Sequence, residues 1–169
     1  VAELSELILV RSEAARLRSY CASVARADVT SRIDFDGVQR ALRELILAVT
    51  TETDNLDALA REGLPVPAMQ RLMREQSILD LCMACVQAPF ERPALFSGQE
   101  LRGAHRPLHA TCRLFQRLLW HLLRDSEDDR AHAARYVGAL QRLLGYSIGV
   151  ASTLAELFTD NDALLDTMD

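Results

Sequence analysis

The chain has 169 residues, 49% of them hydrophobic and 25% charged, with a formal net charge of −5 and a pI near 5.4. A chain of this length can bury one continuous core but is short for two domains. The acidic balance argues against a general nucleic-acid binder, and no apolar run approaches the roughly 18 residues of a membrane-spanning helix. Residues 1–6 are acidic and amphipathic, unlike a secretory signal. We therefore expect one domain over residues 1–169, without nucleic-acid or membrane contact.

All 19 basic residues are arginine. Guanidinium groups are suited to bidentate contacts with anions. The arginines are spread along the whole chain, however, which is typical of a solvated surface. A compositional bias of the genome therefore explains them without selection for a ligand.

Four cysteines, Cys21, Cys82, Cys85 and Cys112, lie within apolar helical patterns. Free cysteine behaves as a small hydrophobic residue when buried, and disulfides are rare in reducing compartments. The pattern predicts reduced, buried thiols in a cytosolic setting.

Apolar residues recur at helical spacing along almost the whole chain, and no convincing strand alternation appears. Ser77 either begins a new turn or lies within one longer helix that ends before Pro89. The predicted helices cover residues 2–25, a segment from a cap at Asp34 or Asp36 to about 49, 55–61, 67–76, 107–123, 127–144, 153–158 and 162–168.

Several helix boundaries have recognisable signals. Gly63 and Gly145 are typical residues to follow a helix, and Pro67 suits the first helical position. Ser126, followed three residues later by Asp129, predicts an N-cap. The segment Phe90 to Gly103, with one proline and two glycines, is the longest predicted loop, and we expect it to be the most mobile segment.

The predicted fold class is all-α. Successive antiparallel helix pairs would bury their apolar stripes against neighbours, as in armadillo or HEAT stacks. No exact period of about 40 residues repeats in the sequence, so periodicity alone leaves a plain helical bundle as the competing architecture.

A zinc site is the first candidate for chemistry, because Cys82-x-x-Cys85 and His105-x-x-x-His109 superficially match a Cys2His2 pattern. Cys82 and Cys85 fall on an apolar helical stripe, however, and the gap before His105 is longer than in a classical finger. We therefore expect buried thiols, no metal and no cofactor.

No catalytic constellation appears in the sequence. His121 lies among leucines beside Trp120, which predicts a partly buried structural histidine. The acidic residues Asp125 and 127–129 lack the spacing of a calcium loop and are explained by favourable charge at a helix N-terminus. An enzyme is therefore not expected.

Arg71 and Arg74 are three residues apart and share one helical face. Two guanidinium groups on one face can bind a phosphate or carboxylate bidentately. On composition alone, we expect them instead to be solvated or paired with Glu75 and its neighbours.

The segment Leu72-Met73-Arg74-Glu75-Gln76, followed by Ile78-Leu79 and Ala88-Pro89-Phe90, resembles the first RIH domain of inositol 1,4,5-trisphosphate receptors. These are tetrameric calcium-release channels related to ryanodine receptors. Collinear similarities run from Leu42 to Leu165, with a deletion of about one helical turn between Tyr136 and Gly145. The resemblance favours the armadillo-like stack over the plain bundle.

The resemblance also implies a ligand site, because the family holds phosphates with basic side chains at two segments. The first family segment carries three cations, where this chain has Pro67, Arg71 and Arg74. The second reads Asp-Tyr-Arg-Lys, and the matching residues here are Asp129, Arg130, Ala131 and His132. The implied site is therefore degraded, and its remaining candidates are Arg71, Arg74, Arg130 and His132.

By the same resemblance, we expect a structural and allosteric domain of a homotetrameric channel on the cytosolic side of the endoplasmic reticulum membrane. Its partners would be an adjacent β-trefoil and other domains of the same channel. Two alternatives remain: inositol phosphate binding through a rearranged basic site, or an armadillo-type adaptor that binds peptides.

Overall fold

The computed structural model describes residues 2–28, 32–51, 55–92 and 106–166. Within these ranges the chain is helical, and its one isolated β-bridge joins Thr50 to Pro65. The all-α prediction is confirmed. The elements are α1 (Ala2–Ala25), α2 (Phe35–Val49), α3 (Pro67–Glu75), α4 (Ile78–Gln87), η1 (Ala88–Glu91), α5 (Arg106–Leu123), α6 (Glu127–Ala133), η3 (Ala134–Tyr136), α7 (Val137–Leu143), η4 (Leu144–Tyr146), α8 (Val150–Phe158) and α9 (Asp162–Leu165).

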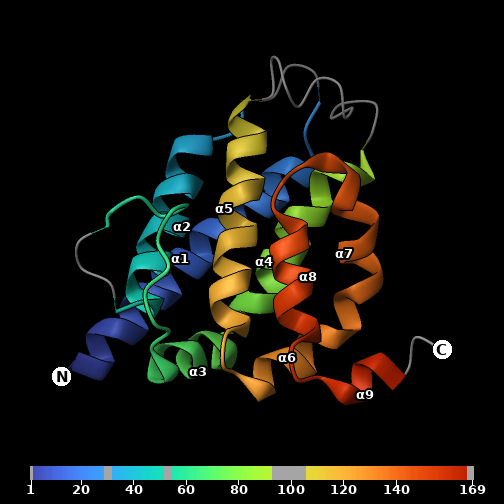
Figure 1. Cartoon of the computed structure of the whole chain (residues 1–169). Coiled ribbons are helices and arrows are strands. Elements are labelled where there is room, and N and C mark those ends of the chain that lie inside the picture. The colour runs from blue at the N-terminus through green and yellow to red at the C-terminus, as the bar shows by residue number, and fades with distance from the viewer. Residues whose placement is uncertain (1, 29–31, 52–54, 93–105, 167–169) are drawn as a thin grey trace.

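The long helices form antiparallel pairs that stack side by side (Figure 1). The pairs are α1 with α2, α4 with α5, and α7 with α8. The second helices of the pairs make one layer, in which α5 packs between α2 and α8, while α1 packs against α4 behind them. This order is that of an armadillo- or HEAT-like stack, as predicted. The short helices α3 and α6 lie at one end of it.

The core lies between the layers. In α2, Val38, Leu42, Leu45 and Val49 recur three or four residues apart and are all buried. They face α5, whose Phe115, Leu118, Leu119 and Leu122 are equally buried. Burying each such side chain contributes about 1.5–3 kcal/mol, so the α2–α5 contact is a main source of stability. The apolar stripes predicted for these two helices therefore face the core.

Caps fix the helix boundaries. Asp34, one of the two predicted caps, accepts a hydrogen bond from the backbone N–H of Gly37 at 2.9 Å. A Cβ atom at position 37 would lie 2.2 Å from the Asp34 carboxylate, so the cap requires glycine there. Ser77 adopts left-handed backbone angles, with φ of 58°, and separates α3 from α4. The two helices are therefore distinct elements.

Two predicted elements differ in the structure. Residues 55–61 form a turn, not a helix, because the side chains of Asn55 and Asp57 accept hydrogen bonds from the N–H groups of Asp57 and Leu59. The predicted helix 127–144 is divided into α6, η3, α7 and the start of η4. A single 3₁₀ turn changes side-chain directions little, so apolar spacing does not reveal it.

The boundaries of several later elements also differ from the predicted ones. Helix α8 begins at Val150 instead of residue 153, and α9 ends at Leu165, with 167–169 outside the described residues. Phe90 and Glu91, assigned above to the long loop, belong to η1; residues 93–103 of that loop, which we expected to be the most mobile, lie outside the described residues. No helix in the described ranges is long and apolar enough to cross a membrane.

Candidate functional site

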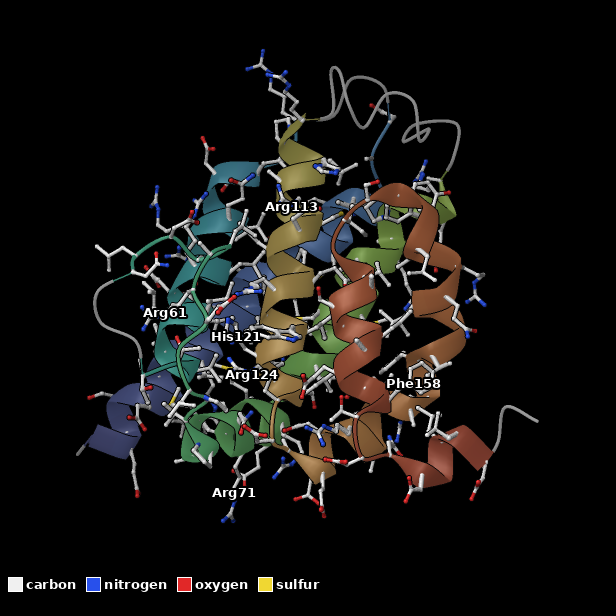
Figure 2. All side chains as sticks on the ribbon, in the orientation of Figure 1. Arg61, Arg71, Arg113, His121, Arg124 and Phe158 are labelled. Carbon is white, nitrogen blue, oxygen red and sulfur yellow. The ribbon has the colours of Figure 1, made fainter. Side chains whose placement is uncertain are left out.

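The candidate phosphate ligands lie at the end of the stack formed by α3 and α6, here called the α3–α6 face. Arg71 is on α3 and points away from the helices (Figure 2). Its side chain is 74% exposed, and its Nε lies 2.9 Å from Oε1 of Glu75, one turn later. The expected pairing with Glu75 is therefore present for Arg71.

Arg74 is held by acidic residues of α6. One of its terminal nitrogens lies 3.0 Å from Oδ2 of Asp129 and the other 3.5 Å from Oδ2 of Asp128. The Asp129 side chain is only 1% exposed. Burial raises the pKa of Asp129, although its contacts with Ser126 and Arg74 act in the opposite direction. Arg74 thus compensates a buried carboxylate of its own chain.

The same carboxylate completes the cap of α6. The Ser126 hydroxyl donates to Oδ2 of Asp129 at 2.6 Å, and the Asp129 N–H donates back to that hydroxyl at 3.4 Å. The predicted N-cap is confirmed. Because Asp129 joins the cap to Arg74, the orientation of α6 against α3 depends on this contact.

Arg130 points into the protein. Its Nε donates to the Leu123 carbonyl at 3.0 Å, and its terminal nitrogens donate to the Thr159 carbonyl at 3.1 Å and to Oε1 of Glu156 at 2.9 Å. The side chain is 8% exposed. One guanidinium group therefore connects α6 to the end of α5 and to the end of α8.

His132 contacts α4. Its Nε2 lies 2.7 Å from Oδ1 of Asp80, and the Tyr136 hydroxyl donates to the same oxygen. Although burial alone would raise it, the pKa of Asp80 is lowered by the hydrogen bonds from Tyr136 and His132 and by nearby Arg135. Burial and the bond to Asp80 raise the pKa of Tyr136 to about 12. His132 is therefore engaged by a carboxylate that stays ionised.

These four residues do not converge on one point. Arg74 faces α6, Arg130 faces α5 and α8, and His132 faces α4, while Arg71 extends into solvent. Each is paired with an acidic side chain of this chain. The partners lie up to 55 residues away in sequence, which local spacing cannot reveal.

The cysteines and histidines of the zinc-like sequence motif do not form a metal site among the described residues. Cys82 and Cys85 are fully buried free thiols on α4, as predicted, and the Cys85 thiol donates to the Leu17 carbonyl at 3.4 Å. Burial raises the pKa of both thiols well above the ordinary range. His109 contacts the Ser147 carbonyl instead, and His105 lies outside the described residues. Among the described residues, no three His, Cys, Asp or Glu side chains group as a metal site would require.

A second arginine cluster lies along the last turns of α5 and just beyond its end, and it was not predicted. Arg117 and Arg124 lie over the ring of Trp120, at 4.1 and 4.4 Å from its centroid. Arg124 donates to the carbonyls of Glu62 and Gly63, and Arg117 donates to that of Arg61. The i, i+3 and i, i+4 spacing of these arginines around a tryptophan is the signal that could have revealed the cluster.

His121 lies beside this cluster and is fully buried, more than the predicted partial burial. Neither ring nitrogen forms a hydrogen bond of good geometry. Burial, together with the charges of Arg117 and Arg124, lowers the pKa of His121 to about 3, and the Arg61 backbone only partly opposes this. The imidazole is therefore neutral and structural.

The sequence profile of the RIH domain matches residues 39–168. The chain is also 25% identical, over 178 aligned positions, to the inositol 1,4,5-trisphosphate receptor itr-1 of Caenorhabditis elegans; this covers 97% of the chain and 6% of that relative. The chain belongs to the RIH-domain family of inositol trisphosphate and ryanodine receptor channels. It spans only a small part of the length of the relative that it matches.

Proposed function

We propose that the chain is a single RIH domain of an inositol 1,4,5-trisphosphate receptor-like calcium-release channel, with a structural and allosteric role and no catalytic one. In this proposal the parent channel is a homotetramer, and the domain lies on the cytosolic side of the endoplasmic reticulum membrane. An adjacent β-trefoil and other channel domains are its partners. The family match and the receptor name of the relative support this assignment.

We also propose that the inositol trisphosphate site of this domain is degraded. The supporting observation is that Arg74, Arg130 and His132 are each held by carboxylates of the chain itself. A ligand phosphate would have to displace these carboxylates, and for the largely buried Arg130–Glu156 pair this costs about 3–5 kcal/mol. Arg130 is the clearest case, because its guanidinium group faces inward.

The substituted positions support the same conclusion. Pro67 is the first residue of α3 and has no backbone N–H to donate. Pro67 and Ala131 are both exposed, so neither side chain is needed in the core. Exposed Asp128 adds negative charge beside Arg74. A polyanion approaching this face therefore meets fewer cations and more acidic groups than in the family pattern.

Calorimetry tests the proposal on a protein that carries this domain together with the β-trefoil. We expect no saturable binding of inositol 1,4,5-trisphosphate at micromolar concentration. Binding at micromolar concentration or tighter, lost in Arg71→Gln or Arg74→Gln, would contradict it. A parallel measurement of folding by circular dichroism separates lost binding from lost structure.

Restoring the missing cations should create affinity in steps. Pro67→Arg and Ala131→Arg place cations at exposed positions, and His132→Lys replaces an imidazole with an ammonium group. Each regained charge-assisted contact is worth on the order of 1.5–3 kcal/mol, or about tenfold or more in affinity. If the triple variant binds no better than the starting protein, the proposed correspondence with the family site is wrong.

Retained binding through a rearranged site is the second candidate, and the exposure of Arg71 favours it. This guanidinium group is tied only to exposed Glu75, a contact worth about 0–1 kcal/mol. A phosphate could therefore recruit Arg71 at low cost. In this case Glu75→Gln would strengthen binding, whereas a degraded site would show no response to that substitution.

A further inference from the structure

A pocket of about 150 Å³ lies between α5 and the beginning of α8, away from the α3–α6 face. Figure 2 shows Arg113 on α5 beside the segment that leads into α8. The described residues that line the pocket include two arginines and no acidic side chain. The residues used below are Arg113, Gln116, Arg117, Trp120, Gly149 and Ser152.

The two arginines give the pocket positive charge. Arg113 is exposed and has no ion-pair or hydrogen-bond partner among the described residues. Arg117 donates one terminal N–H to the Arg61 carbonyl, but its Nε is buried without a partner. Burial lowers the pKa of Arg117, an effect that the charge of Glu62 opposes. An anion in the pocket would likewise favour the charged form.

The first turn of α8 adds backbone donors. This nine-residue helix follows Gly149, whose φ is 92°, and it has neither a side-chain cap nor an acidic residue in its first turn. No side chain of the described residues therefore caps its first N–H groups. By contrast, α2 and α6 are capped by Asp34 and Ser126 and carry acidic residues in their first turns.

Gln116 provides an independent indication of a ligand. Gln116 is only 2% exposed, and its Oε1 accepts a hydrogen bond from the Thr153 hydroxyl at 2.7 Å. Its Nε2 donor is buried and has no partner. An unsatisfied buried donor is costly, and Gln116 lines the pocket, so an acceptor bound there could supply the missing partner.

We propose that this pocket binds a single phosphate group, held by Arg113, Arg117 and Gln116, with Ser152 and the first N–H groups of α8. Two guanidinium groups balance the charge of a phosphate dianion, and the remaining donors match its several oxygens. The volume suits one phosphate group, so a polyphosphate would have to extend into solvent. Free phosphate and a phosphate monoester share this chemistry.

Trp120 provides a local readout, because it lines the pocket and is the only tryptophan in the chain. Its fluorescence is measured during titration of the 169-residue chain with inorganic phosphate and, separately, with glycerol phosphate. Ionic strength is held constant with sodium chloride, which removes the general salt effect. We expect a saturable change with at least one of the two, and the tighter ligand identifies the source of the phosphate group.

Two substitutions test the assignment of residues. Arg113→Gln removes a partnerless surface charge and should weaken binding tenfold or more. Ser152→Glu places a carboxylate in the first turn of α8, a position that favours acidic residues, and should abolish binding while the helix is retained. Arg142→Gln, an exposed arginine on α7 outside the pocket, serves as the matched control and should leave binding unchanged.

Nuclear magnetic resonance gives a second measurement. Phosphate should shift the side-chain amide signal of Gln116 and the backbone N–H signals of residues 150–152, with the same saturation as the fluorescence. The proposal is overturned if neither phosphate compound gives saturation, or if Arg113→Gln and Ser152→Glu bind as tightly as the unchanged chain.

Discussion

Two arginine clusters in this domain differ in how their charge is compensated. On the α3–α6 face, Arg74 and Arg130 are neutralised by carboxylates from other helices. Between α5 and α8, Arg117 contacts a backbone carbonyl and the Trp120 ring, while Arg113 has no described partner. The comparison teaches that arginines already neutralised by carboxylates of the same chain are poor candidates for an anion site.

Removing Arg130 tests the contribution of the paired cluster to stability and has the largest expected effect. Arg130→Gln leaves Glu156 without its partner and frees two backbone carbonyls. We expect the free energy of unfolding to fall by about 3 kcal/mol, measured by chemical denaturation. Arg71→Gln, which breaks an exposed pair, should cost less than about 1 kcal/mol.

A double-mutant cycle sharpens that measurement. If Arg130 acts mainly through Glu156, then Arg130→Gln combined with Glu156→Gln should cost clearly less than the sum of the two single changes. If the two single losses of stability simply add, the loss in Arg130→Gln comes instead from its contacts with the carbonyls of Leu123 and Thr159. Equal losses in Arg130→Gln and Arg71→Gln would contradict the contrast between buried and exposed pairs.

Burial, together with the charges of Arg117 and Arg124, should make stability depend on pH through His121. Its pKa is about 3 in the folded chain, against about 6.5 when unfolded. The unfolded chain therefore binds more protons between these values, so stability is present above pH 6.5 and is lost as pH falls. We expect a loss of about 2 kcal/mol between pH 7 and pH 5 from this residue.

His121→Leu isolates this contribution, because leucine fills similar space and does not titrate. The raised pKa values of Glu13 and Asp129 act in the opposite direction, and they are common to both proteins. The measurement is the difference between the unfolding free energies at the two pH values. His109→Gln, which changes a histidine outside the core, should retain the slope of the unchanged chain.

Removing the cap of α6 has the smallest expected effect. Ser126→Ala deletes the hydroxyl that bonds both the N–H and the carboxylate of Asp129. A lost cap costs about 1 kcal/mol. Ser12→Ala, on an exposed position of α1, should change stability by less than about 0.5 kcal/mol. A loss no larger than this control would show that Asp129 is positioned by Arg74 alone.

Much of the fold could be predicted from the sequence because it depends on local patterns. The stripe of α2 and the caps at Asp34 and Ser126 involve residues within one or two turns. The helix predicted at 55–61 failed because Asn55 and Asp57 bond to nearby N–H groups, a competition that apolar spacing does not register.

The arrangement of the candidate site could not be predicted, because its contacts are not local. Arg74 meets Asp129, and His132 meets Asp80, across more than fifty residues. The family resemblance indicated which basic residues correspond to the family's ligand site, but it did not indicate the carboxylates that pair with them. The α5–α8 pocket left only a weak signal, which is a glutamine at position 116 within a run of apolar residues.

The stacked pairs also imply a gradient of local unfolding along the domain. In such arrays each pair is stabilised by its neighbours, and only the α4–α5 pair has a neighbouring pair on both sides among the described helices. Amide hydrogens of α5 should therefore exchange most slowly with solvent, and those of α7 and α8 faster. A terminal pair could then open while the centre of the domain stays folded.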